Sequence, residues 1–181
     1  MPLIPLITIS ALSGYGLYRS YENITRLQQY EEQSEKAAKW SNAVAERLHK
    51  TRTTQTSSTL SLLISFLTAI YLMIPTTLKR YHFLLAALLN VGALFLSRSH
   101  MASFWNDRKQ IQVPFVEKFN EAIKGSEGVV KLLGLVCSTW AAAGALWMSG
   151  LENALWAQFV FMAGVGALSL ITRNEPPKQV N

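Results

Sequence analysis

The chain has 181 residues, of which half are hydrophobic and 15% are charged, and its formal net charge at pH 7 is +6. Such a low share of charged residues is a poor basis for a soluble surface, so the composition argues against an ordinary soluble domain. The single cysteine, Cys137, excludes a disulfide or a cysteine-rich metal site within one chain.

Five apolar runs without Asp, Glu, Lys or Arg organise the chain. They cover residues 2–18, 58–76, 83–97, 132–149 and 153–172. A bilayer core needs about 20 apolar helical residues, so the last four runs are predicted to span a membrane as two antiparallel hairpins. The first run is diluted by Pro, Ser and Gly, and residues 1–18 therefore either span the membrane or lie in its interface. The predicted fold class is all-α, a multi-span helical membrane protein with amphipathic helices on one side.

Basic residues are concentrated on one side of these spans. All Lys and Arg residues except Lys79 and Arg80 fall in the connections 19–57 and 98–131 or in the tail 173–181. Lys and Arg mark the cytosolic side of a span, or the matrix side in a mitochondrion, and this placement argues against a nucleic-acid surface. The short spans favour a thin bilayer, so the endoplasmic reticulum and the mitochondrial inner membrane are the expected locations.

The polar segment that follows the first run is predicted to be one long helix. Residues 19–52 contain no Pro or Gly and many good helix formers, and they would extend roughly 50 Å. One interpretation is a solvated helix that packs loosely on its own membrane domain. The other is a helix that docks a partner, because small residues leave room for a second helix. The docking residues would be Tyr30, Ala38, Trp40, Ser41, Val44, Ala45 and Leu48.

The first hairpin, 58–97, has clear boundaries in the sequence. Ser57, Ser58 or Thr59 can cap the start of its first helix, and Pro75 should end that helix, because proline cannot continue the backbone ladder. The connection 76–82 is short, so the next span returns antiparallel to the first.

The connection 98–131 is predicted to lie at the membrane surface. Pro114 fits the first position of an amphipathic helix, and Gly125 fits its stop. Aromatic rings suit the headgroup zone, because one edge can stay wet there. The interfacial residues expected in this connection and around the last turn are Trp105, Phe115, Phe119, Trp147 and Trp156.

A near repeat links the two hairpins. VGALFLSRS at 91–99 and VGALSLITRN at 165–174 both stand at the exit end of a second hairpin helix. Either a two-span unit was duplicated, or the likeness reflects the few residue types that fill any span. The second hairpin is predicted to cover 132–172 and so ends within this repeat, and the polar, proline-containing tail 173–181 is predicted to be disordered.

Small residues recur at helical spacing in the second hairpin, which predicts close helix packing. Asn90 and Gln158 are the most polar residues within the spans, and each is expected to hydrogen-bond across helices. The stripes either close the bundle on itself or meet another subunit. The predicted helix-packing residues are Gly134, Ser138, Ala142, Ala141, Ala145, Ala163, Ala167, Asn90 and Gln158.

No catalytic, metal or cofactor site is predicted. His82 and His100 would be some 27 Å apart at the two ends of one span, and the sequence lacks a phosphate-binding glycine loop or a nucleophile elbow. The spans carry no Asp, Glu, Lys or Arg, which argues against an ion-coupled carrier. A channel is also disfavoured, because no charged ring is visible.

The expected function is therefore that of a non-catalytic accessory subunit or assembly factor of a larger membrane complex. Its partners would be the lipid bilayer and other membrane subunits, with no nucleic acid. The alternative is a small membrane enzyme or lipid-handling protein that acts on a hydrophobic substrate at the basic interface. Its candidate polar residues, beside Trp105, are His100, Asn106, Asp107 and Arg108.

Overall fold

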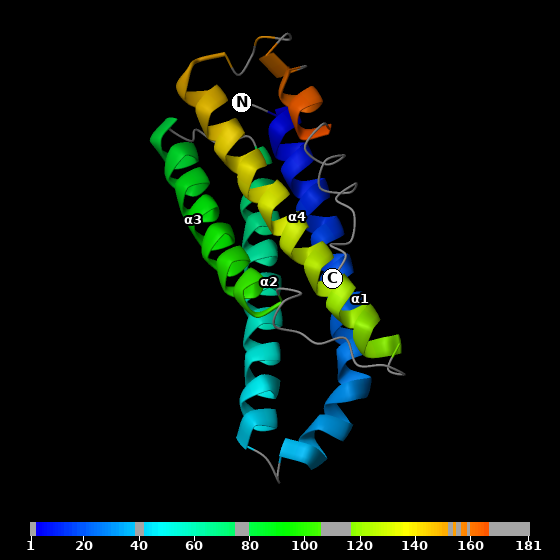
Figure 1. Cartoon of the computed structure of the whole chain (residues 1–181). Coiled ribbons are helices and arrows are strands. Elements are labelled where there is room, and N and C mark those ends of the chain that lie inside the picture. The colour runs from blue at the N-terminus through cyan, green and yellow to red at the C-terminus, as the bar shows by residue number, and fades with distance from the viewer. Residues whose placement is uncertain are drawn as a thin grey trace.

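The protein is a bundle of long helices in a computed structural model (Figure 1). The structure describes residues 3–38, 42–74, 80–105, 117–151, 154, 157–158 and 160–166. Its helices are α1 (Leu3–Ala38), α2 (Asn42–Met73), α3 (Arg80–Phe104) and α4 (Glu117–Met148). Residues 157–158 and 160–166 add a short helical segment, which we call the last segment. The prediction of an all-α fold is confirmed.

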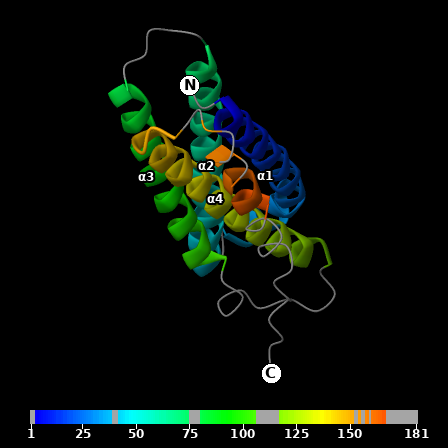
Figure 2. The same cartoon turned by 90° about the horizontal axis from the view of Figure 1, so that it is seen from above.

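Each helix packs against two neighbours, in the order α1, α2, α3, α4 and back to α1, so α1 and α3 stand at opposite corners. Figure 2 shows this arrangement along the bundle. The stretches His49–Met73, Tyr81–Phe104 and Lys124–Met148 are long and apolar enough to cross a membrane, which supports the prediction of a multi-span membrane protein. Half of the predicted span 153–172 lies outside the described residues.

The predicted single helix over 19–52 is wrong. Residues 19–38 continue α1, whereas residues 42–52 begin α2, and the two helices run antiparallel side by side (Figure 1). Strong helix formers in this stretch extend both neighbouring apolar segments instead of forming a separate element.

Two predicted helix ends are also wrong, and one is right. Ser58 and Thr59 do not cap a helix; α2 passes through them, and both hydroxyls donate to the carbonyl of Gln55 at 2.9 Å. Gly125 is not a stop, because α4 is continuous from Glu117 to Met148. By contrast, α2 ends at Met73, two residues before Pro75, as the missing N–H of proline predicts.

Small and hydroxyl side chains build the contact between α1 and α2. The Oγ atoms of Ser13 and Ser65 are 2.9 Å apart, and Gly16 leaves so little space that a Cβ there would be 3.1 Å from both Cδ atoms of Leu62. Helices in lipid associate through such close packing and interhelical hydrogen bonds. The Ser and Gly residues that made the first run a doubtful span are therefore the ones that hold it to α2. The buried polar residues of this seam are Ser13, Ser20, Asn23, Gln55, Ser58 and Ser65.

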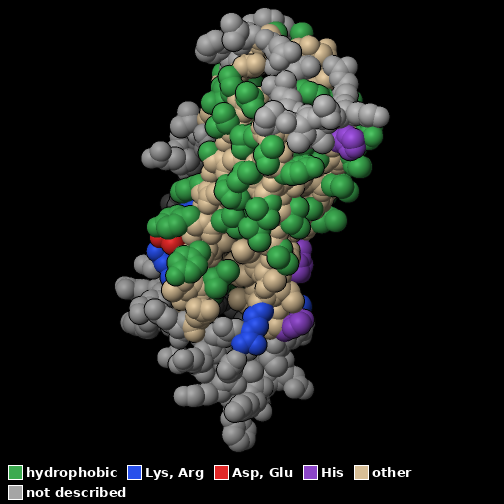
Figure 3. All heavy atoms as spheres, turned by 180° about the vertical axis from the view of Figure 1, so that it is seen from behind, with side chains coloured by type: hydrophobic (Ala, Val, Ile, Leu, Met, Phe, Trp, Pro, Cys, Tyr) green, Lys and Arg blue, Asp and Glu red, His purple; other side chains and the backbone are tan. Residues whose placement is uncertain are grey.

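The outer surface of the bundle is apolar over much of its length (Figure 3). Leu88 is 70% exposed and Leu96 is 69% exposed on α3, and α2 presents Leu60 and Leu67 in the same way. Continuous apolar surface of this extent is unfavourable in water, whereas it is the ordinary outer surface of a helix bundle in lipid.

The first charges of three helices lie at nearly the same height. The Oγ atoms of Ser61 and Ser97 are 2.6 Å apart, so Arg98 lies beside the middle of α2. The side chain of Arg98 also lies against Gly134 of α4, which is one turn from Lys131. The packing of Gly16 on Leu62 brings Arg19 close to the same height. From these residues toward the far ends of α1, α3 and α4, the described residues carry no Asp, Glu, Lys or Arg over about 25 Å.

Candidate functional site

Large apolar residues of α4 form most of its inner face in the bundle. Trp140 is fully buried, its indole N–H donates to Ser65 Oγ at 2.8 Å, and its ring lies 6.4 Å from that of Phe83. Trp147 packs on the same phenyl ring at 4.9 Å. The buried residues of α4 that follow this helical spacing are Val129, Leu133, Val136, Trp140, Ala143 and Trp147.

Three members of the predicted small-residue stripes therefore lie outside the bundle core. Ala141, Ala142 and Ala145 are exposed, and Ser138 is half-buried beside them. In the part of α4 that the structure describes, Ala141, Ala142 and Ala145 do not help to close the bundle core.

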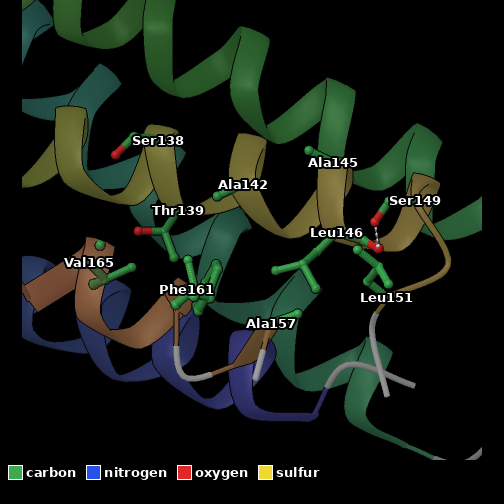
Figure 4. Close-up of a pocket in the computed structure, with 12 residues that line it drawn as sticks. Ser138, Thr139, Ala142, Ala145, Leu146, Ser149, Leu151, Ala157, Phe161 and Val165 are labelled. Carbon is green, nitrogen blue, oxygen red and sulfur yellow. Dashed lines mark hydrogen bonds between the residues drawn. The ribbon is translucent and has the colours of Figure 1, made fainter. Parts of the chain in front are cut away.

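A groove runs between this side of α4 and the last segment (Figure 4). The volume of this open groove is about 590 Å³. Figure 4 shows Phe161 and Val165 of the last segment directed toward α4, opposite Thr139 and Leu146. The residues that line the groove are Ser138, Thr139, Ala142, Ala145, Leu146, Ser149, Leu151, Ala157, Val160, Phe161, Gly164 and Val165.

The hydroxyl groups in the groove are already satisfied by their own helix. Ser138 and Thr139 both donate to the carbonyl of Leu135, at 2.9 and 2.6 Å, and Ser149 donates to Leu146 at 2.9 Å. The groove therefore presents apolar surface with a floor of small residues. The described residues of its lining include no titratable side chain.

The other predicted helix-packing residues have different surroundings. Gly134 lies under the side chain of Arg98, and Ala163 is exposed on the last segment. Asn90 is buried, but its Nδ2 donates to the Ala86 carbonyl of its own helix at 2.8 Å, so it does not make the predicted bond across helices through that atom. Gln158 is half-buried, and Ala167 lies outside the described residues.

Two predicted interfacial tryptophans are turned inward. Trp105 is 2% exposed, and its indole N–H donates to Thr54 Oγ1 at 3.1 Å. Trp147 is likewise buried, against Phe83. Each ring packs on neighbouring helices, so neither has the wet edge that the sequence suggested. Phe119 lies in α4, while Phe115 and Trp156 fall outside the described residues.

The predicted docking residues are divided between two helices. Tyr30 and Ala38 belong to α1, Val44, Ala45 and Leu48 belong to α2, and Trp40 and Ser41 lie outside the described residues. These positions therefore occupy the distal part of an antiparallel hairpin and not one face of a single helix. Among the residues of the alternative enzyme site, His100 is exposed on α3; Asn106, Asp107 and Arg108 fall outside the described residues.

A buried polar layer was missed from the sequence. The amide nitrogens of Asn23 and Gln55 donate to Ser126 Oγ at 2.8 and 3.0 Å, so this layer joins α1, α2 and α4. Gly125 permits the contact, because a Cβ there would overlap Oδ1 of Asn23. The spacing of Ser13, Gly16, Ser20 and Asn23 by three or four residues was the available signal for this packed face.

The site does not point to a metal or to a known family. Within the described ranges, no group of three or more His, Cys, Asp or Glu side chains could hold a metal ion. The chain matches no protein-family model, no curated protein and no solved structure. The fold and the groove define a class: a helical bundle with three helices long and apolar enough to span a membrane, and an apolar groove between α4 and the last segment.

Proposed function

We propose that the protein is a non-catalytic subunit or assembly factor of a larger membrane complex, and that the groove beside α4 receives a helix of a partner subunit. The observation that carries this proposal is the outward-facing floor of small residues on α4. Ser138 and Ala142 are four residues apart, as are Ala145 and Ser149, so two adjacent lines of short side chains face the groove. Such lines let helix backbones approach closely where lipid offers no hydrophobic gain.

The chemistry of the groove supports a helix as its occupant. Its hydroxyls are occupied within α4, and its walls are formed by Leu146, Phe161 and Val165. Apolar walls around a small-residue floor fit the ridge of a second apolar helix. The charge-free height of about 25 Å favours a thin membrane, and the basic end of the bundle would face the cytosol of an endoplasmic-reticulum membrane or the mitochondrial matrix.

A lipid-handling function is the second candidate. The groove volume of about 590 Å³ lies within the range of small-ligand sites, and an acyl chain would meet the same apolar walls. A ligand site of that kind has a few convergent polar groups, whereas the described hydroxyls of this groove are bonded to backbone carbonyls. This difference favours the helix-binding proposal.

Filling the groove tests the proposal. We expect Ala142→Leu and Ala145→Leu each to weaken the complex by about fivefold or more, because each branched side chain overfills a close contact at a cost of about 1–3 kcal/mol. The measurement is the share of the protein in its high-mass band on a native gel in mild detergent. Leu88→Phe is the matched control, since Leu88 is a lipid-facing residue of α3 outside the groove.

The outcome separates the two candidates. Loss of the high-mass band in the groove variants alone supports partner binding. An unchanged band, together with loss of co-purified lipid, contradicts it and favours lipid handling. Point substitutions test the groove more specifically than deletion of residues 19–52, because that deletion would also remove the buried residues Ser20 and Asn23 from the α1–α2 seam.

A further inference from the structure

The side chain of Arg98 lies across the backbone of α4 at Gly134. Its Nε, Cδ and Cζ atoms are 2.9, 3.3 and 3.5 Å from the point that a Cβ of residue 134 would occupy. Any other residue at 134 would compete for the space that the guanidinium and its stem now fill. Gly134 therefore forms a notch that holds Arg98 against α4, at the height where the first charges of the bundle stand.

Arg98 has no carboxylate partner within the described part of the chain. Arg19 pairs with Glu22 at 2.8 Å on α1, the corner of the bundle opposite α3. The backbone N–H and C=O groups of α4 around the notch are hydrogen-bonded within the helix. The exposed guanidinium of Arg98 thus has N–H donors that need an acceptor from outside the described bundle.

The residues around the notch suit the binding of a lipid headgroup. Phe95 and Leu96, just on the apolar side of Arg98, are 56% and 69% exposed. Lys131 stands one turn before Gly134 on α4, so a second basic residue lies at this height. The planar fork of arginine matches two phosphate oxygens, and neighbouring basic residues at the membrane surface attract anionic lipids.

We propose that the Arg98–Gly134 notch, with Lys131 beside it, binds the phosphate of an anionic glycerophospholipid whose acyl chains lie along Phe95 and Leu96. This lipid site is separate from the groove beside α4, because none of these residues lines that groove. It places the lipid on the seam between α3 and α4.

The test is lipid binding by the full-length chain in mild detergent, titrated with phosphatidylglycerol and measured by native mass spectrometry. We expect Arg98→Gln and Gly134→Ala each to lower the affinity tenfold or more, since one removes the charged donor and the other displaces it. The affinity of Arg98→Lys should lie between that of these two variants and that of the unchanged chain, because lysine keeps the charge and lacks the planar guanidinium. Phosphatidylcholine, which has the phosphate without net charge, should bind at least tenfold more weakly.

Two matched controls decide the result. Arg19→Gln removes a charge at the same height, and Gly92→Ala adds a methyl group where no atom lies within 4 Å; both should change the affinity less than twofold. Equal losses in Arg19→Gln and Arg98→Gln would overturn the site in favour of diffuse charge attraction. Unchanged affinity in Arg98→Gln, or displacement of the lipid by millimolar inorganic phosphate, would overturn it as well.

Discussion

Replacing Trp140 by alanine is expected to lower the free energy of unfolding by about 3–5 kcal/mol, the range found when a large buried aromatic ring is removed. Trp140 is fully buried, bonds to Ser65 and packs near Phe83, so its loss would leave a cavity where α4 meets α2 and α3. Trp140→Phe keeps most of the volume and loses the indole donor, so it should cost about 1 kcal/mol.

The measurement is unfolding by sodium dodecyl sulfate in mild-detergent micelles, followed by circular dichroism. Phe95→Ala is the control, because Phe95 is an aromatic residue on the outer surface and should change stability by less than about 0.5 kcal/mol. Similar losses for Trp140→Ala and Phe95→Ala would contradict the packing of α4 described above.

Gly125→Ala is expected to destabilise the protein, although alanine in place of glycine within a helix is ordinarily favourable by roughly 0.5–1 kcal/mol. A Cβ at 125 would overlap Oδ1 of Asn23 and lie 3.1 Å from its Cγ, so Asn23 would have to leave its bond to Ser126. We expect a net loss of about 2 kcal/mol, since buried polar atoms would lose their partners.

The same substitution at the neighbouring Gly128 is expected to change the free energy of unfolding in the opposite direction. Gly128 lies in the same helix, and no atom stands within 4 Å of the point that a Cβ there would occupy, so Gly128→Ala should be neutral or stabilising. In the background of Asn23→Ala, Gly125→Ala should also become harmless, because the obstructing amide is gone. The same unfolding titration measures all four variants. Destabilisation by Gly125→Ala that persists without the Asn23 amide would refute this contact.

Helix type and approximate extent could be predicted from the sequence, because they depend on local composition. Long charge-free runs predicted the spans within α2, α3 and α4, and Pro75 predicted the end of α2 near Met73. These features act within one helix, so they are visible without knowledge of neighbouring helices.

Features that depend on a second helix were mispredicted or missed. Gly125 looked like a helix stop, but its missing side chain makes room for Asn23 of α1. Ser13 and Gly16 looked like flaws in a span, but they form its contact with α2. The sequence does not show whether a glycine or serine ends a helix or lets a second helix pack closely, because the difference depends on the packing partner.

The candidate site was partly predictable for the same reason. The spacing of Ser138, Ala142 and Ala145 indicated a close-packing face, but the sequence left open whether that face closes the bundle. In the structure Leu133, Trp140 and Trp147 are buried in the bundle core, whereas Ala142 and Ala145 line the groove beside the last segment.

The central claim is that the bundle crosses a membrane with one end of its helices on each side. It is tested most directly by single cysteines at Thr25 and Ser103, near the charged end, and at Ile74 and Ser149, near the other end, in a chain with Cys137→Ser. All four positions are exposed. In sealed vesicles, a membrane-impermeant maleimide should label Thr25→Cys and Ser103→Cys from one side, and Ile74→Cys and Ser149→Cys from the other. Labelling of Thr25→Cys and Ile74→Cys from the same side would contradict this arrangement.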